Sequence, residues 1–346
     1  MADRLALFTG GAFADPHAKT AHGILRYGPR EVVAVVDDAC AGSVACDVVP
    51  YARRRVPVVA SVGEAVALGA NVLVIGVAPF GGALTPEWRA ALLEAIGAGM
   101  HVEAGLHTVL AEDDELAAAA ARSGVELRDL RAAPPGLSVP GPERPDARVV
   151  HTVGSDCAIG KMSVTLELDA AARARGLESA FVATGQTGIA ISGWGIAVDH
   201  VISDFVAGAA ALLVEQGAER APLLFVEGQG ALGHPAYSGV TLGLLHGCRP
   251  DLMVLCHRAG AVEIDDYPGV AIAPLPEVVA AYEGAAAWVR PARVAAVALN
   301  TRGLDDAAAR EAIARAASET GLPADDPVRF GGVTLLDALG LETARA

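Results

Sequence analysis

The chain has 346 residues, a length that predicts two domains. Hydrophobic residues make up 53% of it and charged residues 19%, which excludes global disorder. The 26 Lys and Arg residues against 41 Asp and Glu give a net charge of −15, which argues against broad binding to nucleic acid or anionic membranes. A phosphate-bearing ligand therefore needs a local cluster of positive groups.

The first half alternates short apolar runs with segments that carry helix formers and helix-start signals. Strands are expected at residues 5–9, 32–37, 56–60, 72–78 and 101–103. Helices are expected at residues 17–27, 62–68, 86–98 and 113–122. This alternation predicts a parallel α/β sheet with right-handed crossovers.

Residues 132–147 contain five prolines, a density that blocks both helices and central strands and predicts an interdomain linker. The alternation then starts again. Strands are expected at 149–153, 180–183, 223–226, 252–256 and 294–299, and helices at 161–175, 204–216, 277–288 and 305–320. We therefore predict an α/β protein of two unequal domains, covering residues 1–133 and 148–346, with a linker at 134–147.

The most informative motif, GSDCAIGKMS, follows the expected strand at 149–153 and precedes a helix. A glycine-rich turn in this position points backbone N–H groups into one concavity, at the positive end of the helix dipole. Lys161, one of only two lysines, stands where its ammonium would reach outer phosphate oxygens. The predicted phosphate loop comprises Gly154, Ser155, Asp156, Cys157, Ala158, Ile159, Gly160, Lys161, Met162 and Ser163.

The loop departs from the standard spacing in two ways. Five residues separate Gly154 from Gly160, as in dethiobiotin-synthetase-like loops that contain an acidic residue such as Asp156. Met162 occupies the position of the hydroxyl residue that would bind Mg²⁺, and Ser163 comes one position later. Magnesium is compatible with the motif but not implied by it, so no metal ligands are assigned.

A second motif, VEGQGALGHPAYSG, follows the expected strand at 223–226 and belongs at the same sheet edge. Glu227 could hold a metal, orient a substrate amine or act as a base, or it could only cap the next turn. His234 is a candidate proton carrier or a structural loop residue. Gln229 is a candidate substrate-binding residue.

Two further strand ends carry polar groups. Gln186 and Thr187 lie in a glycine-flanked turn, where neutral donors and acceptors could orient a substrate. Asn300, with Arg302 nearby, could read a purine base of a cofactor, or could only close a strand-end turn.

In the first half, Lys19, His22 and Arg26 recur at helical spacing and share one face. That face could contact an anionic substrate or the other domain, or it could simply be solvated. The dinucleotide-binding signal in this half is weak, because GxGxxG is lacking, although Asp37 ends a strand about where a ribose-binding acid would lie.

Five cysteines form no CxxC pair and no metal-ligand spacing, and their odd number is simplest to explain by a reducing cytoplasm. No run approaches the roughly 18 apolar residues that span a bilayer, so neither a signal peptide nor a transmembrane helix is expected. We expect small-molecule substrates and neither nucleic-acid nor membrane partners; a homo-oligomer is permitted but not required.

The motifs KTAHGILRY, GSDCAIGKMS, ATGQTGIAI, EGQGAL and NTRGL, with DPVRFGG near the end, resemble the bacterial family of DgcN-type D-glutamate N-acetyltransferases, long known as a domain of unknown function. The resemblance covers nearly the whole chain. It implies an N-terminal Rossmann-like domain and a C-terminal P-loop NTPase-like domain similar to dethiobiotin synthetase. It also implies acetyl transfer from acetyl-CoA to the amino group of a D-amino acid.

In this hypothesis the loop around Lys161 binds donor phosphates, and Glu227 or His234 takes a proton from the acceptor ammonium. Glycine-loop N–H groups steady the oxyanion, while Arg26, Lys19 or Arg258 grip acceptor carboxylates. The alternatives are an ATP- and Mg²⁺-dependent ligase or kinase, with Lys161 on the transferring phosphoryl group, and a non-catalytic nucleotide sensor.

Overall fold

The computed structural model describes residues 2–77 and 84–341, and Ala78, the last residue of one expected strand, lies outside these ranges. The chain divides into two compact units. Unit 1 runs to Ala132 and also includes Gln186–Ala197; unit 2 comprises Ala133–Gly185 and the chain from Val198 onward. Residues 186–197 therefore pack with unit 1, although they lie in the second half of the sequence.

Unit 1 is built on a six-stranded sheet in the order β3-β2-β1-β4-β5-β6. Every described strand pair in it is parallel. From β1 the chain adds strands outward to β3 on one side, and then outward from β4 to β6 on the other side. This is the strand order of a Rossmann fold. The strands are β1 Arg4–Phe8, β2 Glu31–Val36, β3 Val58–Val59, β4 Val72–Ile75, β5 His101–Ala104 and β6 Leu127–Asp129.

Helices pack on this sheet through small and aliphatic side chains, and the main core lies under α3, α4 and α5. α4 illustrates the local signals: Thr85 caps it by accepting the Trp88 N–H, and Pro86 follows at the first turn. The helices are α1 Lys19–Tyr27, α2 Ala45–Val48, α3 Val62–Ala67, α4 Pro86–Gly97, α5 Asp114–Ser123 and α7 Gln186–Ser192.

Unit 2 holds a second parallel six-stranded sheet, in the order β12-β11-β10-β7-β9-β8. Its strands are β7 Arg148–Gly154, β8 Ser179–Val182, β9 Leu223–Val226, β10 Leu252–Arg258, β11 Arg293–Asn300 and β12 Ala324–Asp325. β7 lies centrally, between β9 and β10, so the loops that follow these three strands share one edge. The two parallel sheets confirm the predicted α/β class.

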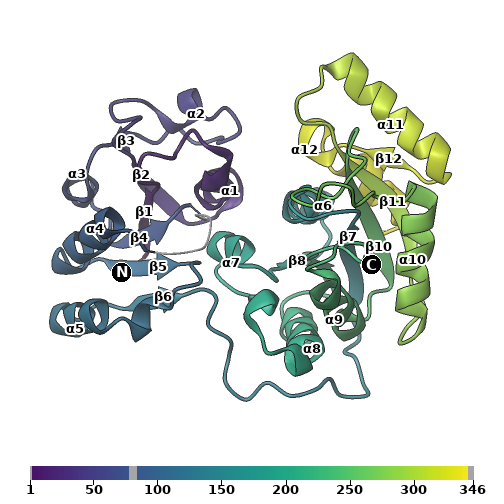
Figure 1. Cartoon of the computed structure of the whole chain (residues 1–346), viewed down its shortest axis with the longest axis horizontal. Helices are drawn as coiled ribbons and strands as arrows, with labels where there is room; N and C mark the ends of the chain where they lie inside the picture. The colour runs from purple at the N-terminus through teal and green to yellow at the C-terminus, as the bar shows by residue number, and fades with distance from the viewer. Residues whose placement is uncertain (1, 78–83, 342–346) are drawn as a thin grey trace. The chain divides into compact units, whose positions relative to one another are not determined.

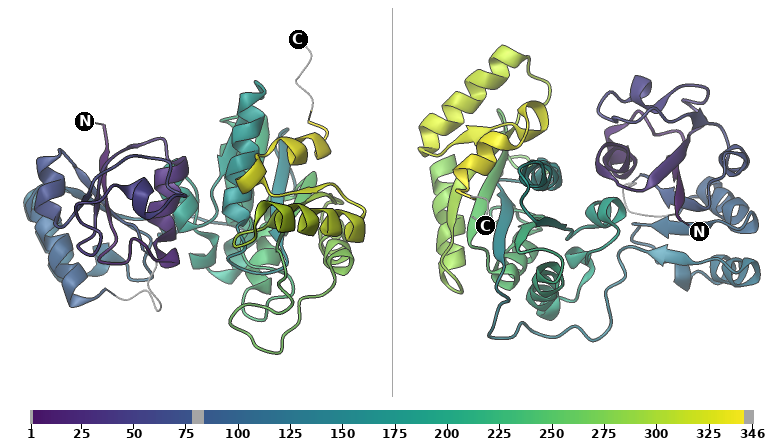
Figure 2. Two further views of the ribbon diagram at one scale, coloured as in Figure 1. Left: turned by 90° about the horizontal axis from the view of Figure 1, so that it is seen from above. Right: turned by 180° about the vertical axis from the view of Figure 1, so that it is seen from behind.

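Helices cover both faces of the second sheet (Figures 1 and 2), and each face has its own hydrophobic core. α6, α12 and α13 pack together on one side, and α8 to α11 pack on the other. The helices are α6 Lys161–Ala174, α8 Val206–Ala218, α9 Ser238–Cys248, α10 Leu275–Ala287, α11 Asp306–Thr320, α12 Pro327–Phe330 and α13 Val333–Ala338.

Several local expectations differ from the structure; among them, the sequence predicts no helix at Ser238–Cys248 and no strand at Leu127–Asp129, where α9 and β6 lie. Gln186 and Thr187, expected in a glycine-flanked turn, instead begin helix α7, and Thr187 Oγ1 lies 2.9 Å from Thr20 Oγ1 of α1. The Ala190 carbonyl accepts a 2.7 Å bond from Arg30. These partners are remote in sequence, so local signals could not show them. The helix expected from residue 204 begins instead at Val206, after a 3-10 turn at Ser203–Phe205.

The proline-rich segment 133–147 contains no helix or strand, and it belongs to unit 2. Its Arg144 pairs with Asp251 at 3.1 Å, and Arg249 donates to the carbonyls of Pro142 and Glu143. A Cβ on Gly208 of α8 would lie 1.6 Å from the Ser138 carbonyl oxygen, so glycine is required where the segment crosses that helix. The segment is therefore tied to unit 2 at several points.

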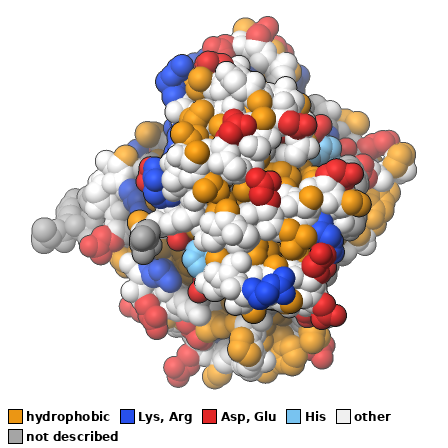
Figure 3. Space-filling model, turned by 90° about the vertical axis from the view of Figure 1, so that its left-hand side faces the viewer, with side chains coloured by type: hydrophobic (Ala, Val, Ile, Leu, Met, Phe, Trp, Pro, Cys, Tyr) orange, Lys and Arg blue, Asp and Glu red, His pale blue; other side chains and the backbone are white. Residues whose placement is uncertain are grey.

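None of the helices in the described part of the chain is long and apolar enough to cross a membrane. Figure 3 shows one face of the molecule, on which basic side chains stand singly among acidic ones. On that face the described residues form no continuous basic patch, in keeping with the net charge of −15.

Candidate functional site

The loop between β7 and α6 has the backbone geometry of an anion cradle. Ala158 and Gly160 both adopt left-handed conformations, with φ of 52° and 109°. Alternation of right- and left-handed residues turns successive N–H groups toward one side. α6 begins without a side-chain cap, and its Val164 N–H bonds to the Gly160 carbonyl at 3.0 Å. The N–H groups of the preceding turn therefore face the loop at the positive end of the helix dipole.

Side chains from other elements hold this loop in place. The Tyr282 hydroxyl of α10 donates to the Gly154 carbonyl at 2.7 Å and accepts the Leu232 N–H at 3.2 Å, so it joins the loops after β7 and β9. Asn300 donates to the Ile159 carbonyl at 3.0 Å. Burial raises the pKa of the Tyr282 hydroxyl, which keeps it a neutral donor.

Two polar contacts link the loop to the segment after β10. One Asp156 carboxylate oxygen accepts the Asp265 N–H at 2.9 Å, and the other accepts the Cys157 N–H at 2.6 Å. The Ser155 hydroxyl lies 2.8 Å from Nδ1 of His257, whose pKa is lowered by burial. The acidic loop residue thus organises the turn through its two oxygens.

Lys161 lies inside the loop, with 6% of its surface exposed. Its ammonium donates to the Asp156 carbonyl at 2.6 Å. Burial lowers its pKa, against the opposing charges of Cys157, Cys256, Asp156 and Glu227. One bond uses one of three ammonium donors. The predicted contact between this ammonium and a phosphate remains a prediction.

Close packing around Lys161 explains two of the motif glycines. A Cβ on Gly154 would lie 3.0 Å from the Lys161 ammonium and 2.9 Å from Ile159. A Cβ on Gly228 would lie 1.9 Å from the Thr152 carbonyl oxygen and 3.0 Å from the Lys161 side chain. The glycines after β7 and β9 therefore make room for the lysine as well as for the turns.

Glu227 is buried at the end of β9, and one of its oxygens accepts the N–H groups of Thr184 and Gly185, at 2.9 and 3.2 Å. Two backbone donors stabilise the ionised carboxylate. This contact matches the capping interpretation of Glu227, although the turn that it holds follows β8 rather than β9. Gln229, beside it, donates to the Thr184 hydroxyl at 3.3 Å.

His234 is 3% exposed and lies between two aromatic rings, with centroids at 4.7 Å from Tyr237 and 5.1 Å from Tyr267. Its Nδ1 accepts the Ala236 N–H at 3.1 Å. Because a backbone N–H can only donate, Nδ1 carries a lone pair, and the neutral ring then carries its proton on Nε2. His234 is thereby prepared as a hydrogen-bond donor.

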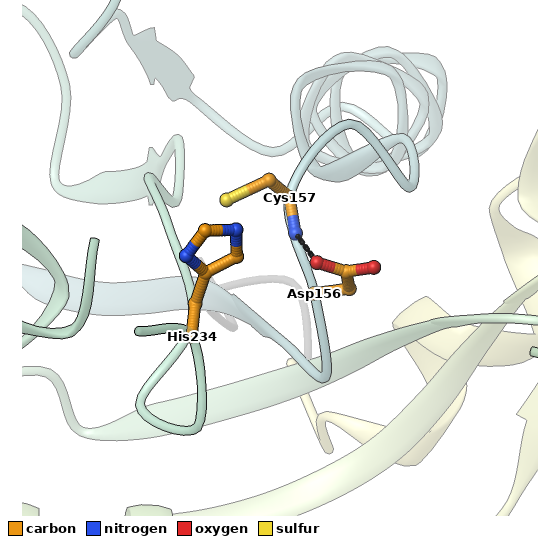
Figure 4. Close-up of side chains that lie close together, drawn as sticks. All are labelled: Asp156, Cys157 and His234. Atoms are coloured by element: carbon orange, nitrogen blue, oxygen red, sulfur yellow. Dashed lines mark hydrogen bonds between the residues drawn. The ribbon is translucent and has the colours of Figure 1, made fainter. Parts of the chain in front are cut away.

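Asp156, Cys157 and His234 come together at this edge, with one polar or sulfur atom of each within 4.8 Å of the others. Figure 4 shows Nε2 as the ring nitrogen on the side of the Cys157 thiol, with Nδ1 turned away from it. Metal binding through Nε2 would move the ring proton to Nδ1, where it would oppose the Ala236 N–H. The geometry therefore favours a contact between imidazole and thiol over a metal site.

A cavity of about 330 Å³ is lined in part by His257, the residue that contacts Ser155 of the loop. Apolar side chains such as Leu275, Leu299 and Ala316 line it, together with Arg315 and Glu319 of α11. Its size and mixed lining suit part of a small organic molecule.

The predicted substrate residues divide between the units. Lys19, Arg26, Gln186 and Thr187 belong to unit 1, whereas Gln229 and Arg258 belong to unit 2. Lys19 is exposed, and the Arg26 guanidinium stacks on the rings of Tyr51 and Tyr27, at 4.4 and 5.1 Å.

The predicted substrate residues Thr187 and Arg258, and the predicted cofactor-binding residue Asn300, have partners within the protein. The Thr187 hydroxyl contacts Thr20 within unit 1, and Arg258 lies 3.7 Å from Asp265. Both ends of the Asn300 amide are used, since its oxygen also accepts the N–H of Arg302, whose side chain is exposed. Their predicted ligand contacts remain predictions.

Sequence reasoning missed Tyr282, His257 and Asp265 as parts of the site. Tyr282 is the one tyrosine of α10, a helix rich in alanine and valine, so the sequence suggests core packing. Asp265 acts through its backbone N–H, which carries no residue-specific signal. His257 is the penultimate residue of β10, so its place near the shared strand edge was the one available signal.

Comparison with known families and structures covers most of the chain. Residues 138–336 match the DUF1611 C-terminal domain, described as a P-loop domain of unknown function. Residues 38–133 match the DUF1611 N-terminal domain, described as Rossmann-like. The crystal structure of a DUF1611 family protein from Anabaena variabilis is similar with a TM-score of 0.92 and 42% identity, covering 98% of this chain and 99% of that one.

Two similar proteins carry a functional name. A D-glutamate N-acetyltransferase of Tritonibacter scottomollicae is 39% identical over 280 residues, which cover 80% of this chain and 83% of the relative. A D-glutamate N-acetyltransferase of a Pseudoalteromonas species is 37% identical over 272 residues, covering 78% and 82%.

Proposed function

Because the chain belongs to the DUF1611 family, we propose that it is an N-acetyltransferase that moves an acetyl group from acetyl-CoA to the amino group of a D-amino acid such as D-glutamate. The observation that carries this proposal is the shared name of two relatives that match about four fifths of the chain. The same motifs had indicated this activity by resemblance.

The loop after β7 supports acetyl-CoA as the donor. Coenzyme A carries a pyrophosphate and a 3′-phosphate, and such groups bind at helix N-termini where N–H groups lack partners within the helix. The start of α6, uncapped by any side chain, and the Lys161 ammonium offer these features together. Residues 154–163 would hold donor phosphates, and the cavity lined by His257, whose ring lies 2.8 Å from the Ser155 hydroxyl, would take an apolar part of the donor.

The hydrogen bonds around Glu227 and His234 narrow their roles. One Glu227 oxygen accepts the N–H groups of Thr184 and Gly185, so this side chain is engaged with the turn after β8. His234 presents an N–H at Nε2, which suits it to donate a hydrogen bond to negative charge that develops during transfer. We assign Glu227 to hold the turn after β8. We assign His234 to donate a hydrogen bond from Nε2 to the negative charge that develops during transfer.

The five cysteines, all in the described part of the chain, are free thiols, which supports a reducing compartment such as the cytoplasm. In such a compartment small-molecule metabolites are the expected substrates.

The test is a parallel incubation with acetyl-CoA and either D- or L-glutamate, and with ATP, Mg²⁺ and the same amino acid. We expect CoA thiol and an N-acetylated amino acid in the first arm, at a higher rate with the D-enantiomer, measured by thiol titration and mass spectrometry. ADP that forms only with the amino acid would instead support the ligase alternative and overturn the proposal.

A further inference from the structure

The side chain of Cys157 lies where an acyl group could be received, although the phosphate loop was assigned only to binding. The thiol is half-buried, so it is neither fully exposed nor sealed in the core. It faces Nε2 of His234, a ring held by Tyr237, Tyr267 and the Ala236 N–H. A thiol and an imidazole in this proximity are the usual components of a cysteine nucleophile.

Three groups near Cys157 would stabilise a negative charge on its sulfur. His234 offers an N–H from Nε2, and the buried Lys161 ammonium interacts electrostatically with Cys157. Cys157 also precedes the positive end of α6. Asp156 opposes these groups, but its carboxylate oxygens already accept the N–H groups of Cys157 and Asp265.

Cys248 and Cys256 are fully buried, unlike Cys157. Burial raises the pKa of Cys256 to about 12 and also raises that of Cys248, so both thiols are protonated and inert near neutrality. Cys40 and Cys46 are half-buried like Cys157 but lie in unit 1, which makes them suitable controls.

Resting on the proposed function, we propose that Cys157 is a catalytic nucleophile that carries the acetyl group between an acyl-CoA thioester and the amine. In the first half-reaction the Cys157 thiolate attacks the acetyl carbon, the bond from that carbon to the CoA sulfur breaks, and CoA leaves as a thiolate. In the second, the neutral amine attacks the acetyl-cysteine, the bond from carbon to the Cys157 sulfur breaks, and the amine proton passes to solvent. Both steps balance without an oxidant, a reductant or ATP.

The first step exchanges one thioester for another, which suits a thiol acceptor. Because the same loop is assigned to the donor phosphates, the flexible pantetheine arm has to fold back for the acetyl group to reach Cys157. His234 has a single role in both steps: its N–H stabilises the Cys157 sulfur whenever that atom is negative. Its Nδ1 remains bonded to the Ala236 N–H throughout, so no tautomer change is required.

The decisive experiment is isotope exchange between acetyl-CoA and labelled CoA with no acceptor present. An enzyme with an acetyl-cysteine intermediate catalyses this exchange, whereas direct transfer from donor to amine cannot. We expect exchange by the wild-type protein and by Cys46→Ser, and its loss in Cys157→Ser. Acid quenching followed by peptide mass spectrometry should place one acetyl group on the peptide that contains Cys157.

For Cys157→Ala we expect kcat for amide formation to fall at least about a hundredfold, with the Kd for CoA and the Tm close to those of wild type. Wild-type exchange is informative even if a variant fails to fold. N-acetylated product without exchange, or an acetyl group on another residue, overturns the inference and leaves the proposed function standing. If the wild-type protein forms no N-acetylated amino acid at all, the proposed function fails, and the inference with it.

Discussion

The first strand of each sheet is followed by a glycine-rich turn, and the two turns are stabilised in different ways. After β1, Asp37 accepts the Thr9 hydroxyl at 2.7 Å, the Phe13 N–H at 2.9 Å and the Cys40 N–H at 3.1 Å. After β7, the start of α6 has no side-chain cap, and the loop is held from outside by Tyr282, Asn300 and Asp265.

The difference concerns where a negative charge is placed. In unit 1 the buried carboxylate of Asp37, which follows β2, accepts the Thr9 hydroxyl and the Phe13 N–H of the turn after β1, so a negative charge already occupies this strand edge. In unit 2 the Asp156 carboxylate binds two other N–H groups, while a lysine takes the central position and the helix start stays available to an anion. Topology alone therefore does not predict a phosphate site, and it is the arrangement of charges that favours one in unit 2.

Replacement of the lysine should have the largest effect on binding. In Lys161→Met, which keeps most of the buried volume, we expect the KM for acetyl-CoA to rise tenfold or more, because a charge-assisted contact of about 1.5 to 3 kcal/mol is lost. The matched control is Arg173→Met near the other end of α6, which removes a cation that pairs with Asp169. An unchanged KM in Lys161→Met would remove the ammonium from donor binding.

A paired substitution compares the two turns directly. Tyr282→Phe leaves the Leu232 and Gly154 N–H groups without their hydroxyl acceptor, and Asp37→Asn weakens the turn after β1. Each should lower the free energy of unfolding by about 1 to 3 kcal/mol, measured by urea denaturation. Only Tyr282→Phe should also weaken CoA binding in a calorimetric titration. Equal loss of CoA affinity in both variants would contradict the assignment of the site to unit 2.

The pH dependence of stability should differ between the central strands, because β7 contains a buried histidine and β1 does not. Burial lowers the pKa of His151 to about 4, from about 6.5 in an unfolded chain. As pH falls below about 6.5, the unfolded state binds a proton that the folded state refuses, so stability is lost down to about pH 4.

Between about pH 7 and about pH 5.5 this single group should remove about 1 kcal/mol from the free energy of unfolding. Urea titrations at the two pH values should show a smaller difference in His151→Asn than in wild type. Hydrogen exchange should show the acid-induced loss in β7 before β1. Equal pH dependence in wild type and variant would contradict the role of His151.

The fold was predictable from sequence where the local pattern was sufficient. Buried parallel strands such as β10 appear as continuous apolar runs, and helices such as α11 begin at a capping aspartate, Asp305. α7 was not predictable, because QTGIAIS is flanked by glycines and its helix is stabilised by Thr20 and Arg30 from the other half of the chain. Tertiary contacts override weak local preference there.

The site was predictable only in its local part. Glycine spacing and the rarity of lysine indicated the loop at 154–163, since both are features of a continuous segment. The contact of Cys157 with His234 depends on two loops that meet only because β7 and β9 are neighbours. The same holds for Tyr282, whose hydroxyl acquires its importance from the loops that pack against α10.

The smallest expected effect comes from Asn300, which contacts the loop through one bond. Asn300→Ala removes its bond to the Ile159 carbonyl, so we expect the KM for acetyl-CoA to rise about two- to tenfold. Asn71→Ala is the counterpart in unit 1, where an asparagine amide also accepts one backbone N–H and donates to one carbonyl, and it should leave that KM unchanged.

An acetyl-CoA analogue with hypoxanthine in place of adenine separates the two interpretations of Asn300. If the amide reads the purine, wild type discriminates between the two donors and Asn300→Ala loses that discrimination. If the amide only shapes the loop, Asn300→Ala weakens the binding of both donors equally. The ratio of their two KM values is then the same in the variant as in wild type. We expect the constant ratio, because the bonds of the Asn300 nitrogen to Ile159 and of its oxygen to Arg302 fix the orientation of the amide against the loop.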